Sequence, residues 1–143
     1  MKKPNFLNKI ATFYPTNSKN GNGSPIFYIN YDNAPLTIEL YLNCVLAGLT
    51  PEKSYIVHLN ILSDDGTTKV DTDNYITGQD MFEGNYIKEE NINTGSFTIT
   101  TPKFIVNPGI HYYNVSLILK DSDGNIWDNG STWFLTRPDQ EKE

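Results

Sequence analysis

Cysteine, histidine and arginine, three residue types that often carry chemistry, are scarce in this sequence. Its 143 residues include one cysteine, Cys44, which excludes an internal disulfide and a multi-cysteine zinc site. Because Cys44 lies in an apolar run, we expect it to be a small buried hydrophobe. The sequence has two histidines, His58 and His111, so any catalysis or metal binding by histidine must use them. Arg137 is the only arginine, and therefore the only planar fork for a phosphate or a carboxylate.

The chain also lacks a cluster of positive charge and a long apolar run. Its formal net charge is −6, its sequence pI is near 4.8, and its lysines are spread along the chain. A protein that binds nucleic acid needs a basic patch, so we expect no nucleic-acid partner. No apolar run approaches the roughly 20 residues that a bilayer-spanning helix needs, so we expect no membrane partner. Polar residues interrupt the apolar stretch that follows the basic start. We therefore predict no secretion signal and expect a cytoplasmic location.

Alanine, the strongest helix former, is rare, whereas strand-favouring aromatic residues are abundant. The sequence contains nine Tyr, seven Phe and two Trp, and such residues suit the pleated, half-buried surface of a sheet. No segment carries apolar residues at helical spacing over three turns. The length corresponds to one domain, which can bury enough surface to fold without a metal or a disulfide.

Apolar residues instead alternate with polar ones along several segments. Every second residue from Leu36 to Leu46 is apolar, and residues 55–61 and 113–119 repeat the pattern. A period of two is typical of strands with one buried face. The segment 67–95 is ambiguous, because 70–76 is a candidate strand whereas 78–91 is an irregular excursion or a helical turn. Residues 95–109 carry one or two strands around Pro102.

These segments predict an all-β fold, a single antiparallel, immunoglobulin-like β-sandwich of seven to nine strands. Residues 26–137 form the predicted sandwich domain. Residues 1–25 are expected to be a loosely ordered N-terminal segment, because 15–25 consist of turn-forming and polar residues. Residues 138–143 are expected to be a polar tail.

The turn that precedes residues 55–61 carries a local likeness to known domains. Leu49, Pro51 and Tyr55 resemble the tyrosine corner of fibronectin type III and related immunoglobulin-like sandwiches. The resemblance implies that Tyr55 begins a strand and that its hydroxyl bonds backbone upstream, at a turn carbonyl. In fibronectin type III modules this corner precedes the penultimate strand, whereas most of this chain follows it. A standard module of that family is therefore not expected over the whole chain.

A second likeness lies before the last hairpin. With Gly109, Tyr112 and Tyr113 at that point, the overall layout is similar to that of small uncharacterised β-sandwich proteins of bacteria and phages. This resemblance implies a fold and a binding role, with an origin in a phage or another mobile element. It brings no catalytic residues with it.

The acidic hairpin near the C-terminus offers a candidate calcium site. Asp121, Asp123 and Asn125, with Asp128 nearby, could gather oxygen ligands. An EF-hand loop would place its glycine sixth and a glutamate twelfth, whereas Gly124 comes fourth and no such glutamate follows. We therefore predict a hairpin turn with solvated carboxylates and no metal.

The two histidines are not expected to form a catalytic or metal site. His58 falls on the polar phase of its strand, and His111 follows the Pro108-Gly109 turn. Catalysis also needs an oriented partner within reach, and no nucleophile motif is present. We expect two solvent-facing histidines, no cofactor and no enzymatic activity.

Four aromatic residues are the candidate binding residues: Trp127, Trp133, Tyr112 and Tyr41. Flat rings beside Asn and Asp acceptors could hold sugar rings by stacking. In the alternative interpretation, Trp133 packs between the sheets and Trp127 covers a hairpin. The sequence therefore favours a non-catalytic binding or structural protein with a protein partner or self-association. Carbohydrate binding through these aromatic residues is the second hypothesis.

Overall fold

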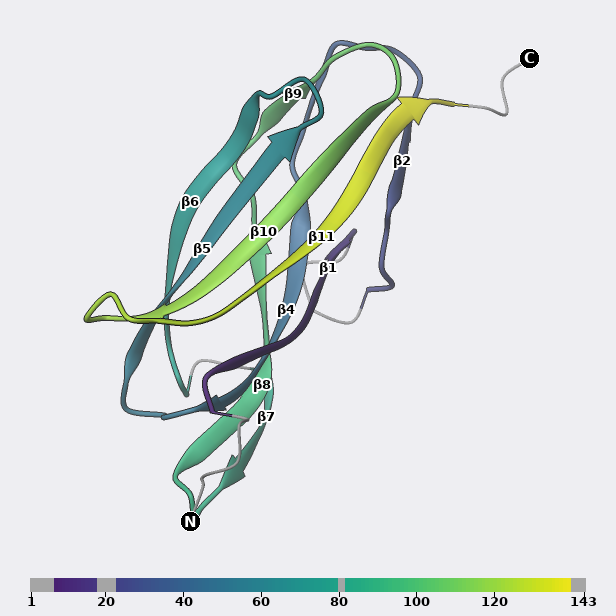
Figure 1. Ribbon diagram of the computed structural model, residues 1–143. Coiled ribbons are helices and arrows are strands. Elements are labelled where there is room, and N and C mark those ends of the chain that lie inside the picture. Colours follow the sequence, from purple (N-terminus) through teal and green to yellow (C-terminus); the bar gives the residue numbers. More distant parts are fainter. Residues whose placement is uncertain (1–6, 18–22, 80–81, 140–143) are drawn as a thin grey trace.

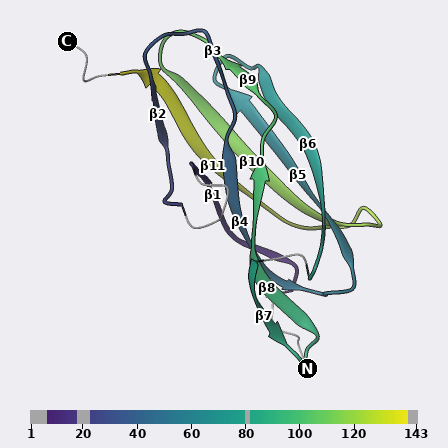
Figure 2. The same cartoon turned by 180° about the vertical axis from the view of Figure 1, so that it is seen from behind.

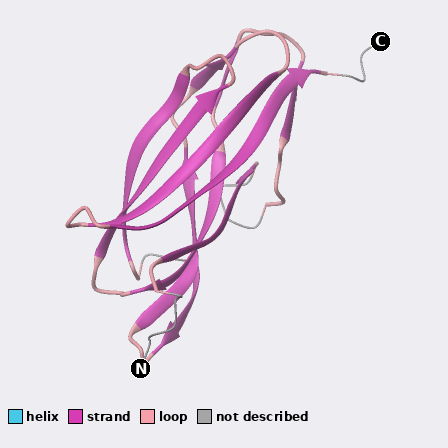
Figure 3. Ribbon diagram, in the orientation of Figure 1, coloured by secondary structure: helices cyan, strands magenta, loops and turns pink. Residues whose placement is uncertain are grey.

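The computed structural model describes residues 7–17, 23–79 and 82–139, and these form an all-β structure (Figure 1). Figure 3 shows strands and loops without a helix in these ranges, which confirms the predicted fold class. Accordingly, none of the described residues belongs to a helix that could cross a membrane. The strands are β1 (Lys9–Thr16), β2 (Tyr28–Tyr31), β3 (Leu36–Ile38), β4 (Tyr41–Leu49), β5 (Ser54–Ser63), β6 (Thr68–Thr77), β7 (Phe82–Ile87), β8 (Ile92–Thr100), β9 (Phe104–Val106), β10 (His111–Asp121) and β11 (Ile126–Pro138).

The strands form a sandwich of two main sheets and one short additional pair. One sheet has the order β1-β4-β8-β7, the other has the order β2-β11-β10-β5-β6, and β3 pairs with β9. Figures 1 and 2 show the two layers from opposite sides, with the β7–β8 hairpin extending beyond the body of the sandwich. The five-stranded sheet therefore forms one of the two layers of the sandwich.

The structure has more strands than the seven to nine predicted, and not every pairing is antiparallel. The alternating run from Leu36 to Leu46 is divided into β3, which pairs with β9, and β4, which pairs with β1 and β8. In the gap, the Leu40 amide donates a hydrogen bond to Thr101 Oγ1 (2.9 Å) instead of to a neighbouring strand. At the sheet edge, β2 runs parallel to the end of β11, so the five-stranded sheet is mixed.

The ambiguous middle of the sequence is made of strands. β6 contains the candidate strand 70–76, and β7 lies within 78–91, where an irregular excursion or a helical turn was the expectation. Two strands, β8 and β9, flank Pro102. Residues 80–81 lie outside the described part.

The prediction of a loosely ordered segment over residues 1–25 is wrong for β1. This strand pairs with β4, and its Phe13 ring lies in the core. The register shifts between Ile10 and Thr12, which breaks the alternation that would have revealed the strand. Pro15 is tolerated because β1 is an edge strand, where a missing amide donor costs little. Residues 1–6, 18–22 and 140–143 of the predicted flexible ends lie outside the described ranges.

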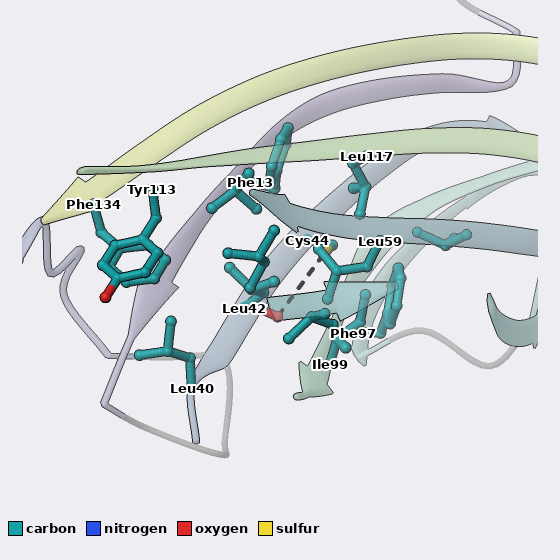
Figure 4. Packing of buried hydrophobic residues seen from close by; sticks show 14 of the residues in the cluster. Phe13, Leu40, Leu42, Cys44, Leu59, Phe97, Ile99, Tyr113, Leu117 and Phe134 are labelled. Carbon is teal, nitrogen blue, oxygen red and sulfur yellow. Dashed lines mark hydrogen bonds between the residues drawn. The ribbon is translucent and has the colours of Figure 1, made fainter. Parts of the chain in front are cut away.

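The core lies between the two sheets, where the alternating positions of the sequence face each other (Figure 4). Tyr113 and Phe134 stack at one end of the cluster, at the left of Figure 4, with ring centroids 4.5 Å apart. Cys44 is fully buried, as expected, and this burial raises the pKa of its thiol far above the ordinary range. Burying one large aliphatic side chain contributes about 1.5–3 kcal/mol. The fully buried aliphatic residues are Leu42, Leu46, Leu49, Val57, Leu59, Ile61, Val106, Val115, Leu117 and Leu119.

Tyr55 begins β5 and is buried, as the likeness to a tyrosine corner implies. Its hydroxyl accepts a hydrogen bond from the amide of Thr50 (2.9 Å) and donates one to Asn8 Oδ1 (2.9 Å). The upstream backbone partner is therefore an amide and not the carbonyl that was expected. Through these two bonds the tyrosine joins the 50–53 turn to the start of the chain's first strand.

Candidate functional site: an aromatic face on the five-stranded sheet

Large apolar side chains occupy the solvent side of the five-stranded sheet near the C-terminal end of β11. Tyr28, Tyr112 and Trp133 expose 51%, 56% and 45% of their surface, and Leu62 is also exposed. Such side chains usually face the core of a sandwich, so their presence on one outer face requires an explanation. We call Tyr28, Leu62, Tyr112, Trp133 and Leu135 the aromatic face.

Strand pairing brings the members of the aromatic face together. Leu135 on β11 lies opposite Tyr112 of β10 and opposite Tyr28 of β2. Trp133 lies one outward position further along β11, opposite Asn114. Leu135 is nearly buried although it does not belong to the core between the sheets. Neighbouring side chains therefore cover Leu135, with Tyr28 and Tyr112 on its two sides.

Ring contacts and an arginine fix one end of this surface. The Trp133 ring centroid lies 5.4 Å from that of Phe27 and 6.1 Å from that of Tyr28. The Arg137 guanidinium carbon lies 4.8 Å from the Tyr28 ring centroid, within cation–π range. Its Nε donates a hydrogen bond to Asn30 Oδ1 (2.8 Å). The rings and the guanidinium are therefore held in fixed positions before any ligand arrives.

A groove of about 450 Å³ marks the other end of the aromatic face. Leu62, Asn114 and Trp133 line it from one row across β5, β10 and β11, and Tyr112 and Asp64 line it as well. Among the described residues no hydrogen bond engages the Asn114 side chain, which leaves its amide available to a ligand. The arrangement is an apolar surface with a few convergent polar groups, as is common in small-molecule sites.

The carboxylate of Asp64 is positioned by its neighbours. His111 Nδ1 lies 2.9 Å from Asp64 Oδ1, and the Tyr112 amide donates to Asp64 Oδ2 (3.1 Å). The hydrogen bond from His111 is the largest cause that lowers the pKa of Asp64, and the bond from the Tyr112 amide adds to it. The same contact with Asp64, followed by the bond to the Pro108 carbonyl, raises the pKa of His111 above 6.5. Asp64 therefore presents a fixed negative charge beside the groove.

The structure brings together two of the four predicted binding residues, Trp133 and Tyr112. Both line the groove, so the alternative in which Trp133 packs between the sheets is wrong. Tyr41 lies on β4 of the opposite sheet, where it lines a separate pocket of about 330 Å³. Tyr28 lines that pocket as well, so Tyr41 neighbours the aromatic face without belonging to it.

Trp127 lies away from the aromatic face, at the β10–β11 hairpin. Six residues of extended strand separate it from Trp133, which corresponds to about 20 Å. Its indole Nε1 donates a hydrogen bond to Asp121 Oδ2 (3.0 Å). Trp127 therefore covers the hairpin, as the alternative interpretation predicted for this residue, and is not part of the same site as Trp133.

The Asp121 hairpin is a closed turn. Asp121 also accepts hydrogen bonds from the backbone amides of Asp123 and Asn125 and from the Asn125 side chain. These bonds, with that from Trp127, occupy the carboxylate that calcium would need. No group of three potential metal ligands occurs in the described part of the chain.

The two histidines each contact carboxylates but do not meet. His58 Nε2 lies 2.8 Å from Asp71 and its Nδ1 lies 2.6 Å from Asp73, on the outer side of the sheet. His58 pairs in register with Ile118, which is seven residues from His111 along β10. That separation corresponds to about 23 Å of extended strand. A joint histidine site is thus excluded.

Sequence reasoning missed Tyr28, Leu62 and Leu135. A signal was present in the alternation itself, because Leu62 occupies the outward, polar phase of β5 just after the buried Ile61. Trp133, Phe134 and Leu135 are three consecutive apolar residues, so alternation cannot tell which of them face solvent. The pairing with Tyr28 is invisible in sequence, because β2 and β11 are far apart along the chain.

The fold resembles parts of larger proteins of known structure. A putative β-galactosidase from Bacteroides fragilis aligns over 88% of this chain and 17% of its own, with 13% identity and a TM-score of 0.57. A β-glucuronidase from Bacteroides uniformis aligns over 76% of this chain and 14% of its own, with 15% identity and a TM-score of 0.53. At this identity the likeness concerns the β-sandwich fold alone. No protein-family model and no curated protein matches the sequence.

Proposed function

We propose that this chain is a non-catalytic carbohydrate-binding domain whose ligand lies on the aromatic face. The observation that carries the proposal is the set of three exposed rings, Tyr28, Tyr112 and Trp133, held on adjacent strands of one outer face. Sugar rings present an apolar face of C–H groups, which is attracted to the negative face of an aromatic ring. Asn114 and Asp64 then supply polar atoms for the hydroxyls at the edge of the sugar.

Two further observations support a sugar-binding accessory role. The two solved structures compared above are enzymes whose names specify sugar substrates, β-galactosides and β-glucuronides. This chain spans about a sixth of their length or less, so we propose the role of an accessory domain. The distance between the two histidines and the closed Asp121 turn favour binding without catalysis and without a cofactor.

Tryptophan fluorescence can test this function at a single residue. In a Trp127→Phe variant, Trp133 is the only tryptophan, and titration with galactan- or hyaluronan-derived oligosaccharides should shift its emission. In the matched Trp133→Phe variant, Trp127 is the only tryptophan and should give no shift. Absence of a shift in the first variant with every oligosaccharide, or an equal shift in both, would reject the aromatic face as a sugar site.

A protein partner is the second candidate function. The aromatic face combines Tyr, Trp and Arg, the residue types that dominate binding energy at protein interfaces. Self-association through this face would give a mass above the 16.2 kDa of one chain by light scattering. A Trp133→Ala variant should then return to the mass of one chain, whereas sugar binding alone predicts one chain for both proteins.

A further inference from the structure

We propose that the preferred ligand of the aromatic face is an acidic glycan, whose carboxylate is bound by Arg137. This inference rests on the proposed function and specifies its substrate class. The argument begins from the position of Arg137 on β11. Trp133, Leu135 and Arg137 alternate along one strand and therefore point to the same side of the sheet. A ligand stacked on Trp133 can thus reach the guanidinium without leaving the surface.

The guanidinium is held in a binding-competent geometry. Its Cζ lies over the Tyr28 ring, and the hydrogen bond from Nε to Asn30 holds one edge of the group. Among the described residues, none accepts a hydrogen bond from the terminal nitrogens of Arg137, and these nitrogens form the edge of the fork that a ligand would meet. An arginine fork matches a carboxylate in geometry and can form two parallel hydrogen bonds with it.

The charge environment singles this residue out. The chain carries seventeen Asp and Glu residues and a single arginine. No ion pair within the described part joins Arg137 to a carboxylate. A guanidinium that lies over an exposed tyrosine ring without such a pair can receive an anion from outside.

The two ends of the aromatic face would orient such a ligand. Asp64 lies level with Leu135 on the β5 side, whereas Arg137 lies on β11, two strand spacings across and two residues further along, which corresponds to about 12 Å. The negative end suits hydroxyl donors, whereas the positive end suits a carboxylate. A glycan that alternates uronate and neutral sugars would place its acid against Arg137 and a neutral ring beside Trp133.

The experiment compares one oligosaccharide with and without its charge. Binding of a hyaluronan tetrasaccharide and of its methyl ester to the full chain is measured by isothermal titration calorimetry. We expect the acid to bind about tenfold more tightly than the ester, as for a charge-assisted bidentate pair. Arg137→Gln should remove this preference, and Arg137→Lys should restore only part of it, because a lysine lacks the fork.

A matched control separates local recognition from net charge. Lys120→Gln removes one positive charge from the same outer face at the far end of β10, about 26 Å from Tyr112, and should leave the preference intact. Equal binding of acid and ester by the wild type, or equal effects of the Arg137→Gln and Lys120→Gln variants, would overturn the inference while leaving sugar binding standing. If neither the acid, nor its methyl ester, nor a galactan-derived oligosaccharide binds, the proposed function itself is rejected.

Discussion

Tyr55 shows how one hydroxyl can join distant segments of this chain. It accepts a hydrogen bond from the Thr50 amide and donates one to the Asn8 side chain. The ring itself is buried in the core. A buried polar group contributes more by avoiding an unsatisfied partner than by the bond itself. Tyr55 therefore stabilises the turn and the start of the N-terminal strand together.

The first prediction concerns this hydroxyl. Tyr55→Phe keeps the ring but leaves the Thr50 amide without its partner, so it should lower the free energy of unfolding by about 1–2 kcal/mol. Urea denaturation followed by circular dichroism measures this change. Tyr75→Phe is the control. Tyr75 is 75% exposed, so the loss of its hydroxyl should lower the free energy of unfolding by less than about 0.5 kcal/mol. Equal stability of the two variants would contradict the role assigned to Tyr55.

The second prediction concerns the pH dependence of the His111–Asp64 pair. The pKa of His111 is raised and that of Asp64 is lowered, chiefly by their mutual hydrogen bond. A raised histidine pKa contributes stability below about pH 6.5, and this contribution is lost as pH rises through the folded-state value. A lowered aspartate pKa contributes above about pH 4, and this contribution is lost as pH falls through the folded-state value. The pair therefore stabilises the fold most between these limits.

A His111→Gln variant tests this pH dependence. The stability advantage of the wild type over the variant should be largest near pH 5 and smaller at pH 9, as measured by urea denaturation at each pH. Histidine NMR resonances supply an independent measurement, in which His111 should titrate above 6.5. A constant advantage across this range, or a His111 pKa at or below 6.5, would rule out the pair as a source of stability.

At the scale of elements, a close backbone contact holds the end of β6 against the 50–53 turn. Gly78 is buried, its amide donates to the Lys53 carbonyl (3.0 Å), and its carbonyl accepts from Asn93 Nδ2 (3.0 Å). A Cβ at this position would collide with the backbone of Thr50 and Pro51. Only glycine allows the two segments to approach so closely.

The third prediction follows from this contact. Gly78→Ala should lower the free energy of unfolding by about 1–3 kcal/mol, because backbone atoms cannot move aside as a side chain can. Thermal denaturation measures the change. Gly66→Asn is the control: Gly66 has a positive φ but open space around it, and asparagine tolerates such a conformation. A Gly78→Ala variant as stable as the wild type would show that the two segments can separate at no cost.

Individual elements differ in how well the sequence predicts them. In β5 and β10 every second residue from Tyr55 to Ile61 and from Tyr113 to Leu119 is apolar and buried, so both strands were predictable from that pattern. The break between β3 and β4 was not predictable, because apolar alternation continues through Leu40. There the hydrogen bond from the Leu40 amide to the Thr101 side chain replaces pairing with a neighbouring strand. β1 was hidden by its register shift and by Pro15. In each missed case a contact distant in sequence determines the local structure.

At the scale of the whole molecule, the sequence predicts the sandwich but only part of the candidate site. Alternation determines that two apolar layers face each other, which the core confirms. It does not determine which residue of the run Trp133, Phe134 and Leu135 faces the core, since that depends on register with neighbouring strands. The immunoglobulin-like assignment stays a prediction, because the comparisons support the β-sandwich fold alone.

One measurement tests the binding site most directly: the map of ¹⁵N–¹H chemical-shift changes when a hyaluronan tetrasaccharide is added to the full chain. We predict that the largest changes occur at the Trp133 indole and at the amides of Tyr112, Asn114 and Leu62, while the Trp127 indole stays unchanged. Changes centred on the Trp127 hairpin or on the four-stranded sheet, or no changes with this or a galactan-derived oligosaccharide, would contradict a sugar site on the aromatic face.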